Sequence, residues 1–219
     1  MTKNVAGSPV ADVVFEEKRI LVTLEDGRAL AAPLGWAGPT VVEMDATGRA
    51  GWVLTNEGRG INWPAAGQNS PDGAIDVWTL EQDALFEQAL AELAAADWDV
   101  SALSPRSRSL VALWRLVADG YNGGLMQLLG NWGIQEIHAV LASLDEVHAT
   151  RTLAVVRDFW DLVGPIAESE EVTTMDEVYA AVSGDRSDRL QELDEEFWDA
   201  ALELTRLVPL AFGPAPSAV

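Results

Sequence analysis

The sequence contains no cysteine and only two histidines, His138 and His148. Without cysteine the chain has no disulfide bond, no thiolate metal site and no cysteine nucleophile. The spacing of the two histidines matches no His-Glu-x-x-His or comparable metal-binding pattern, so we expect no metal ion. Basic residues are also scarce: 14 Lys and Arg stand against 35 Asp and Glu, which gives a formal net charge of −21. Such a chain repels phosphate backbones and anionic lipids, so we expect no direct binding to nucleic acid or to a membrane.

Long apolar runs and known catalytic motifs are missing as well. The sequence has no run of about 18 apolar residues that would predict a membrane span, and its N-terminus lacks a charged-then-apolar signal sequence. By default we therefore expect a cytoplasmic protein. There is no Gly-x-Ser-x-Gly elbow and no phosphate-binding loop, because the glycine-rich segment Gly120–Gly124 carries no Lys.

These absences predict a protein that is not an enzyme, with no catalytic residue and no cofactor. One catalytic alternative stays open, because the chain is rich in neighbouring carboxylates such as Glu170 and Glu171. Two carboxylates can act as a general acid and a general base. The alternative is therefore a small carboxylate-based hydrolase.

What the chain does have is apolar material and an uneven distribution of acid. Hydrophobic residues make up 48% of the sequence, and nine Trp are spread along it, which is typical of packed cores. Residues 1–70 hold 8 acidic and 6 basic side chains, a net charge of −2, whereas residues 71–219 hold 27 acidic and 8 basic ones, a net charge of −19. This acidity has two interpretations: it keeps the protein in solution, or it attracts a basic protein.

The periodicity of the apolar residues divides the chain into a β-rich part and a helical part. The turn Glu25–Arg28 contains an Asp-Gly pair and predicts a hairpin. Residues 64–76 are rich in Gly, Pro, Asn and Ser, which is typical of a linker, and beyond them the apolar period changes from about two to about 3.6 residues. The predicted strands are 10–15, 19–24, 29–33, 53–55 and 60–63, with a short helix within 45–52.

We therefore predict an α+β protein, with a small β-rich N-terminal domain followed by a larger all-α helical domain. The predicted boundaries are residues 1–66 for the small α+β domain, 67–78 for the linker and 79–212 for the acidic all-helical domain.

Local signals place the ends of the predicted helices. Thr79 and Gln82 have the spacing of a capping box and open the first helix. The pair Gly164-Pro165 predicts a helix end, and we expect the tail 213–219 to be frayed. The predicted helices are 79–96, 104–118, 121–132, 134–147, 149–163, 174–182 and 185–208.

One face of the last predicted helix concentrates negative charge. At about 100° per residue, seven of its carboxylates fall within an arc of about 100°, and Arg206 is the only base that we place in this arc. The seven carboxylates, which we call the acidic face, are Asp185, Asp188, Glu192, Glu195, Glu196, Asp199 and Glu203. The residues that we expect to be buried on the other side are Leu190, Leu193, Phe197, Ala201, Leu204 and Val208.

The acidic face has a charge spacing close to that of DNA. At a rise of about 1.5 Å per residue it is about 27 Å long and carries roughly one charge per 4 Å, against about 3.4 Å per phosphate along one DNA strand. The wider segment 168–203 holds 13 acidic residues and only two basic ones, Arg186 and Arg189. We therefore hypothesise that the acidic face binds a basic surface of another protein. The simpler alternative is a solvated acidic face without a partner.

A glycine-rich helix entry carries a resemblance to a known family. The motif consists of Tyr121, Asn122, Gly123, Gly124, Gln127 and Asn131. With the helices around it, this motif resembles a bacterial family of acidic, all-helical DNA-mimic proteins, and the similarity covers roughly residues 80–210. The resemblance implies a helical fold in which the motif is structural. It also implies a negative surface that sequesters a basic DNA-binding regulator.

The N-terminal part shows a second, shorter resemblance. It is carried by Phe15, the turn at Leu24–Arg28, the pair Pro33-Leu34 and the segment Gly60–Pro64. On these residues the chain from about 10 to 80 is similar to a small bacterial domain of unknown function that is associated with antitoxins. This resemblance implies an interaction module. It keeps a different partner open, because the whole protein would then be an antitoxin or immunity-type protein that neutralises a basic toxin.

Overall fold

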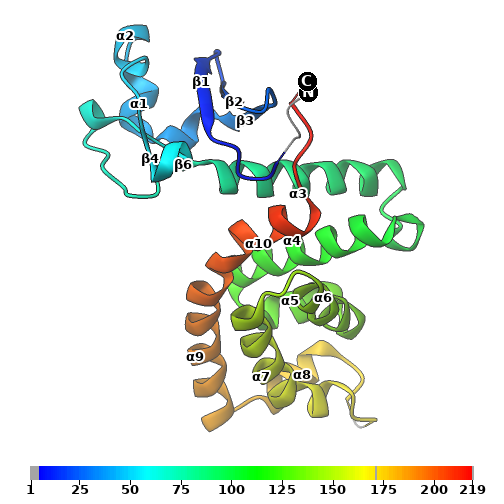
Figure 1. Ribbon diagram of the computed structural model, residues 1–219. Helices are drawn as coiled ribbons and strands as arrows, with labels where there is room; N and C mark the ends of the chain where they lie inside the picture. Colours follow the sequence, from blue (N-terminus) through cyan, green and yellow to red (C-terminus); the bar gives the residue numbers. More distant parts are fainter. Residues whose placement is uncertain (1–4, 171, 219) are drawn as a thin grey trace. The chain divides into compact units, whose positions relative to one another are not determined.

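The computed structural model describes residues 5–170 and 172–218 (Figure 1). The chain divides into two compact units, which we call the N-terminal unit (Met1–Gln88 with Val208–Val219) and the helical unit (Ala89–Leu207). Two small antiparallel sheets come first in the chain, and helices dominate after them. The predicted α+β class is therefore confirmed.

The first sheet of the N-terminal unit is an antiparallel meander of three strands, β1 (Val10–Phe15), β2 (Arg19–Leu24) and β3 (Ala29–Pro33). Every second residue of β2, beginning with Ile20, is buried, because successive side chains of a strand point to opposite faces. Gly27 lies in the turn between β2 and β3 with φ of +89°, a conformation that glycine adopts at little cost. The bounds of all three strands agree with those predicted.

The second sheet is smaller, and a buried tryptophan follows its central strand. Its antiparallel strands are β4 (Val53–Thr55), β5 (Gly60–Asn62) and β6 (Ile75–Asp76). Trp63 directly follows β5, is fully buried, and donates its indole N–H to the carbonyl oxygen of Arg49 at 2.8 Å. The short helical segments of this region are η1 (Leu34–Ala37), α1 (Pro39–Glu43), α2 (Ala46–Arg49), η2 (Asn56–Gly58) and η3 (Pro64–Ala66).

Helix α3 (Val77–Ala95) begins earlier than predicted and with a different cap. The carboxylate of Asp76 accepts hydrogen bonds from the backbone N–H of Thr79 at 3.0 Å and from its hydroxyl at 2.5 Å. The predicted capping box of Thr79 with Gln82 is therefore wrong, because Asp76 caps the helix instead by accepting the N–H of Thr79.

The C-terminal tail is bound to the N-terminal unit rather than frayed. Ala215 is almost completely buried, and its N–H donates to the carboxylate of Glu81 at 2.7 Å. The N–H of Ala218 donates to the carbonyl oxygen of Ala29 at 2.7 Å. The expectation of a frayed tail is wrong for residues 213–218, since these backbone groups have partners inside the unit.

The helical unit is built from helices whose positions largely follow the apolar period. Its elements after α3 are η4 (Val100–Ala102), α4 (Pro105–Gly123), α5 (Leu125–Trp132), α6 (Ile134–Glu146), α7 (Thr150–Ala167), α8 (Met175–Ala181), α9 (Asp185–Ala200), η5 (Ala201–Glu203) and the start of α10 (Leu204–Phe212). Helices α4, α6, α7 and α9 form a closed ring, in which each packs against the next and α9 packs against α4. Side chains such as Leu113, Phe159 and Phe197 are fully buried in this unit.

Helix α7 continues past its predicted end. We expected it to stop at Gly164, but it runs to Ala167 with Pro165 inside its last turn. A proline has no backbone N–H, so the helix lacks the i→i−4 hydrogen bond that residue 165 would otherwise donate. The N–H of Glu168 donates to the carbonyl oxygen of Gly164 at 2.9 Å and closes the turn over the proline.

Candidate functional site

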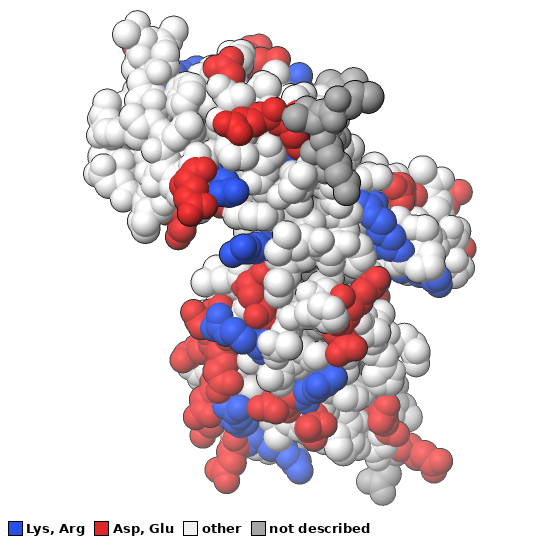
Figure 2. All heavy atoms as spheres, in the orientation of Figure 1, with Lys and Arg blue, Asp and Glu red and all other residues white. Residues whose placement is uncertain are grey.

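The acidic face lies along α9 and the 3₁₀ turn η5 that follows it. Six of its seven carboxylates belong to exposed residues of α9, and Glu203 in η5 is half-buried. Figure 2 shows acidic side chains along the edge of the molecule that α9 forms, at the lower left, with basic side chains among them.

The buried side of α9 directs these carboxylates outward. The apolar residues that we expected to be buried are all less than 10% exposed: Leu190, Leu193, Phe197, Ala201, Leu204 and Val208. This part of the prediction is confirmed. The predicted single helix 185–208 differs in one respect, because η5 interrupts it before α10 begins at Leu204.

A base on α9 itself compensates part of the negative charge. Arg189 makes ion pairs with Glu196 at 2.7 Å, with Glu192 at 3.1 Å and with Asp158 of α7 at 3.4 Å. The expectation that only Arg206 lies within the acidic arc is therefore wrong. Arg189 stands three residues before Glu192, a spacing that places both side chains on one side of a helix.

Helix α7 supplies further partners to the acidic face. Arg151 makes an ion pair with Asp199. The carboxylate of Glu203 accepts hydrogen bonds from the backbone N–H of Thr152 at 2.9 Å and from its hydroxyl at 3.0 Å. The N-cap residue of α7 is Ala149, whose side chain makes no capping hydrogen bond. Glu203 of η5 therefore supplies the capping group for this helix.

Three carboxylates of the acidic face are left without a hydrogen bond or an ion pair to any described residue: Asp185, Asp188 and Glu195. All three are exposed. No described side chain pairs with them, so they are the members of the acidic face whose carboxylate oxygens are free to contact a partner.

The glycine motif forms the junction between α4 and α5. The predicted helix 121–132 is wrong at its start, because Tyr121–Gly123 end α4 and the chain turns at Gly124, which has φ of +82°. A Cβ atom at Gly124 would lie 2.3 Å from a carboxylate oxygen of Asp194 on α9. That carboxylate accepts the backbone N–H of Leu125 at 2.8 Å, and burial raises its pKa.

The amides of the motif surround a buried carboxylate that sequence reasoning missed. Oδ1 of Asp119 accepts hydrogen bonds from the side-chain amides of Gln127 at 2.8 Å and Asn131 at 2.9 Å, while Oδ2 accepts the indole N–H of Trp132 at 2.7 Å. Asp119 is only 8% exposed. Every donor comes from α5, so the carboxylate joins the end of α4 to the helix that follows it.

The remaining motif residues lie at the surface. Tyr121 donates its hydroxyl to the carbonyl oxygen of Trp198 on α9 at 3.1 Å. Asn122 is exposed and has no hydrogen-bond partner among the described residues. A Cβ atom at Gly123 would lie 1.9 Å from the side-chain oxygen of Gln127, so glycine leaves room for that amide.

A signal for Asp119 was present in the sequence. It lies four residues after Arg115 and three after Leu116, on the stripe of α4 that points to the core. Charged residues on an apolar stripe need partners when they are buried. Arg115 has such partners too, an ion pair with Glu136 at 2.6 Å and the ring face of Trp132 at 3.8 Å.

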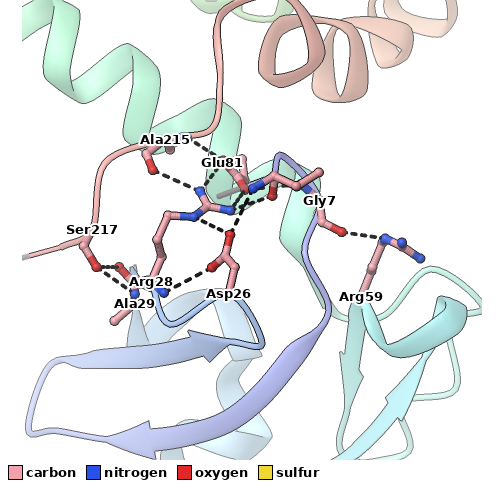
Figure 3. A network of polar contacts seen from close by, with 9 residues as sticks. Gly7, Asp26, Arg28, Ala29, Arg59, Glu81, Ala215 and Ser217 are labelled. Atoms are coloured by element: carbon pink, nitrogen blue, oxygen red, sulfur yellow. Dashed lines mark hydrogen bonds and ion pairs between the residues drawn. The ribbon is translucent and has the colours of Figure 1, made fainter. Parts of the chain in front are cut away.

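The N-terminal unit holds a second cluster of buried charges (Figure 3). The guanidinium of Arg28 makes ion pairs with Asp26 and with Glu81, both at 2.8 Å. It also donates to the carbonyl oxygens of Val5 at 2.8 Å and Ala215 at 3.0 Å. One side chain thus joins the hairpin turn, helix α3 and both terminal segments of the unit.

This cluster leaves no group free for chemistry. Glu81 is completely buried, and each of its carboxylate oxygens accepts one hydrogen bond from Arg28 and one from a backbone N–H, that of Gly7 or that of Ala215. A carboxylate with both oxygens occupied is a poor acid or base for a substrate. The cluster therefore serves the fold of the N-terminal unit.

One cavity of the helical unit carries no titratable side chain. A cavity of about 350 Å³ in the helical unit is lined by Trp132, Met175, Val178 and seven further described residues, none of them titratable. Within residues 5–170 and 172–218 there is no group of three His, Asp or Glu residues that could hold a metal ion, and no helix long and apolar enough to cross a membrane. Glu171, one of the carboxylates behind the hydrolase alternative, lies outside the described residues.

Comparison with known proteins assigns a family to the helical part of the chain. The DMP19-like protein family matches residues 101–210, which is half of the chain. The matched segment contains α4 to α9, and with them the motif around Asp119 and the acidic face. The match leaves the N-terminal region unassigned, and no curated protein and no solved structure matches the chain.

Proposed function

The chain belongs to the DMP19-like protein family, and we propose that its helical unit is a protein-binding module whose acidic face competes with DNA for a basic, DNA-binding protein. In this proposal the protein acts by binding rather than by catalysis. The observation that carries it is the set of three exposed carboxylates on α9, Asp185, Asp188 and Glu195, which have no partner among the described residues.

The charge of the helical unit supports a basic partner. Residues 89–207 hold 22 acidic and 8 basic side chains, a net charge of −14. A field of this sign attracts basic proteins and repels nucleic acid. It also speeds the encounter with a basic partner, an effect that falls as salt is added.

The ion pairs of α9 make its likeness to DNA looser than the sequence suggests. With Arg189 and Arg151 subtracted, the acidic face carries a net five negative charges over about 27 Å, or about one per 5 Å. A DNA strand has about one phosphate per 3.4 Å. We therefore propose competition for a DNA-binding surface through part of its basic residues, and not a copy of the whole phosphate backbone.

The test neutralises the carboxylates that have no internal partner. The triple variant Asp185→Asn, Asp188→Asn, Glu195→Gln removes three charges without breaking an ion pair of the fold. Its control is Asp97→Asn, Asp145→Asn, Asp176→Asn, which removes the same charge from exposed, unpaired residues of the helical unit outside α9.

Each protein is used to capture partners from a lysate of the source organism at low and at high salt. We expect the native chain and the control to retain a basic protein at low salt, and the α9 variant to lose most of it. The purified partner should bind duplex DNA, and the native chain should displace that DNA. A captured toxin whose activity the chain inhibits would support the antitoxin alternative instead. Equal capture by the native chain, the α9 variant and the control would exclude the acidic face as the binding surface.

A further inference from the structure

An exposed apolar patch lies directly beside the acidic face. It consists of Tyr121 near the end of α4, Trp198 on α9 and Leu202 in η5, which are 45%, 47% and 61% exposed. Leu202 follows Trp198 by four residues, the spacing that places two side chains on one side of a helix. We call these three residues the apolar patch.

Hydrogen bonds hold the two aromatic rings of the patch in place. The hydroxyl of Tyr121 donates to the carbonyl oxygen of Trp198, and the indole N–H of Trp198 donates to the carbonyl oxygen of Gly120, each at 3.1 Å. The ring of Tyr121 also packs on buried Phe197, with ring centroids 5.8 Å apart. Both polar groups are used within the fold, so the parts of the rings that face solvent are apolar.

Such an arrangement is suited to binding. Exposed apolar side chains in a group mark interaction sites more often than scattered ones do, and Trp and Tyr are frequent anchors of protein interfaces. Rings that are already fixed lose little conformational freedom when a partner covers them.

The charges around the patch indicate the chemistry of its occupant. Asp199 adjoins Trp198 in the sequence, and burial, with the charge of Asp199 as the smaller cause, raises the pKa of the Tyr121 hydroxyl. Glu195, which has no partner among the described residues, lies one turn before Trp198 on α9. Ring faces of Trp and Tyr also attract Lys and Arg through cation–π interactions. Basic and aliphatic groups are therefore both favoured here.

We propose that the apolar patch anchors an amphipathic basic segment of the partner protein, a helix that places Lys or Arg on the acidic face and aliphatic side chains on Tyr121, Trp198 and Leu202. This inference rests on the proposed function and adds to it a source of selectivity. Charge alone attracts any basic protein, whereas the patch favours one whose basic residues flank an apolar stripe.

Two probes of equal charge separate the patch from the acidic face. One is an 18-residue helical peptide of Lys and Leu with the Leu residues on one side, and the other is an oligolysine with the same number of Lys. Titration of the full chain with each peptide at constant salt gives both affinities. We expect the Lys–Leu peptide to bind about tenfold more tightly, which corresponds to about 1.4 kcal/mol.

Three variants assign this difference to residues. Leu202→Ser removes an exposed side chain, and Trp198→Ala tests the ring at the cost of its hydrogen bond to Gly120. Each should weaken binding of the Lys–Leu peptide about fivefold or more and leave oligolysine binding unchanged. The control is Trp98→Ala, which removes a Trp that is 66% exposed. Trp98 precedes the start of α4, whereas Tyr121 of the apolar patch lies near the end of that helix, so the control lies away from the patch. Circular dichroism checks the fold of each variant.

The outcomes are distinct for the patch and for the proposed function. Equal affinity for the two peptides, or unchanged binding of the Lys–Leu peptide by Leu202→Ser, overturns the proposed role of the apolar patch. Neither result contradicts binding of a basic partner by the acidic face. Failure of both peptides to bind at low salt overturns the proposed function as well. Self-association of the chain that Leu202→Ser abolishes, measured by analytical ultracentrifugation, would assign the patch to a second copy of the chain and also overturn the proposal.

Discussion

The carboxylates inside this protein and those on α9 have opposite surroundings. Glu81 and Asp119 are buried, and hydrogen bonds from the protein occupy both oxygens of each carboxylate. Asp188 and Glu195 are exposed and accept nothing from any described residue. A buried charge is stable only when it is paired and hydrogen-bonded, whereas an exposed one is solvated and keeps its oxygens for another molecule.

This difference separates acids that the fold needs from acids that it does not need. Net charge alone cannot make the separation, because both kinds contribute equally to the value of −21. The hydrogen-bond and ion-pair partners of each carboxylate do distinguish the two kinds. They also predict opposite results for mutation: removal of an inner carboxylate should affect stability, and removal of an outer one should affect binding.

The largest effect is expected for Glu81 in the N-terminal unit. Glu81→Ala leaves the buried guanidinium of Arg28 with Asp26 as its only charged partner and removes the acceptor for the N–H of Ala215. Breaking a buried ion pair on one side costs about 3–5 kcal/mol. Urea unfolding, followed by amide hydrogen exchange in β1, β2 and β3, measures the loss.

The matched control for this variant is Glu87→Ala, which removes an exposed carboxylate from the same helix. We expect it to change stability by about 0.5 kcal/mol or less. A loss below about 1 kcal/mol for Glu81→Ala would contradict the assignment of the Arg28 cluster to the fold.

A smaller effect is expected for Asp119 in the helical unit. Asp119→Ala leaves the donors of Gln127, Asn131 and Trp132 without their acceptor. Buried donors without partners cost about 1–3 kcal/mol, and we expect the lower part of this range because Gln127 and Trp132 are partly exposed and can be reached by water. Urea unfolding with hydrogen exchange in α4 and α5 measures it, and the control is Asp145→Ala, which removes an exposed carboxylate from α6.

Periodicity predicted the fold better than it predicted the partners of charged groups. The bounds of β1, β2 and β3 and the buried side of α9 follow from residues close together in the sequence. The ion pair between Arg28 and Glu81 joins residues 53 positions apart, and the contact of Arg28 with Ala215 spans 187 positions. No local pattern carries such pairings, because they depend on how the elements pack.

The acidic face shows the same division between what the sequence can predict and what it cannot. Its orientation was predictable, since it lies opposite an apolar stripe on one helix. The compensation of Asp199 by Arg151 and the binding of Glu203 to Thr152 come from α7, about fifty residues earlier in the chain. The local pair of Arg189 with Glu196 was within reach of helical spacing, which places residues seven apart on the same side.

The smallest effect on stability is expected for the three outer carboxylates. Asp185 and Asp188 lie in the first turn of α9, where negative charge is favourable by about 0.3–1 kcal/mol each. Against this, their removal together with Glu195 relieves repulsion in four pairs of carboxylates spaced three or four apart, by about 0.2–0.5 kcal/mol for each pair. The two contributions oppose each other, so the free energy of unfolding of the triple variant to Asn and Gln should lie within about 0.5 kcal/mol of that of the native chain.

A contradicting outcome for the triple variant is a loss of stability as large as that of Asp119→Ala, because these carboxylates would then stabilise the fold. Unchanged stability with lost, salt-dependent binding to a basic protein is the combination that only a binding role for the acidic face explains.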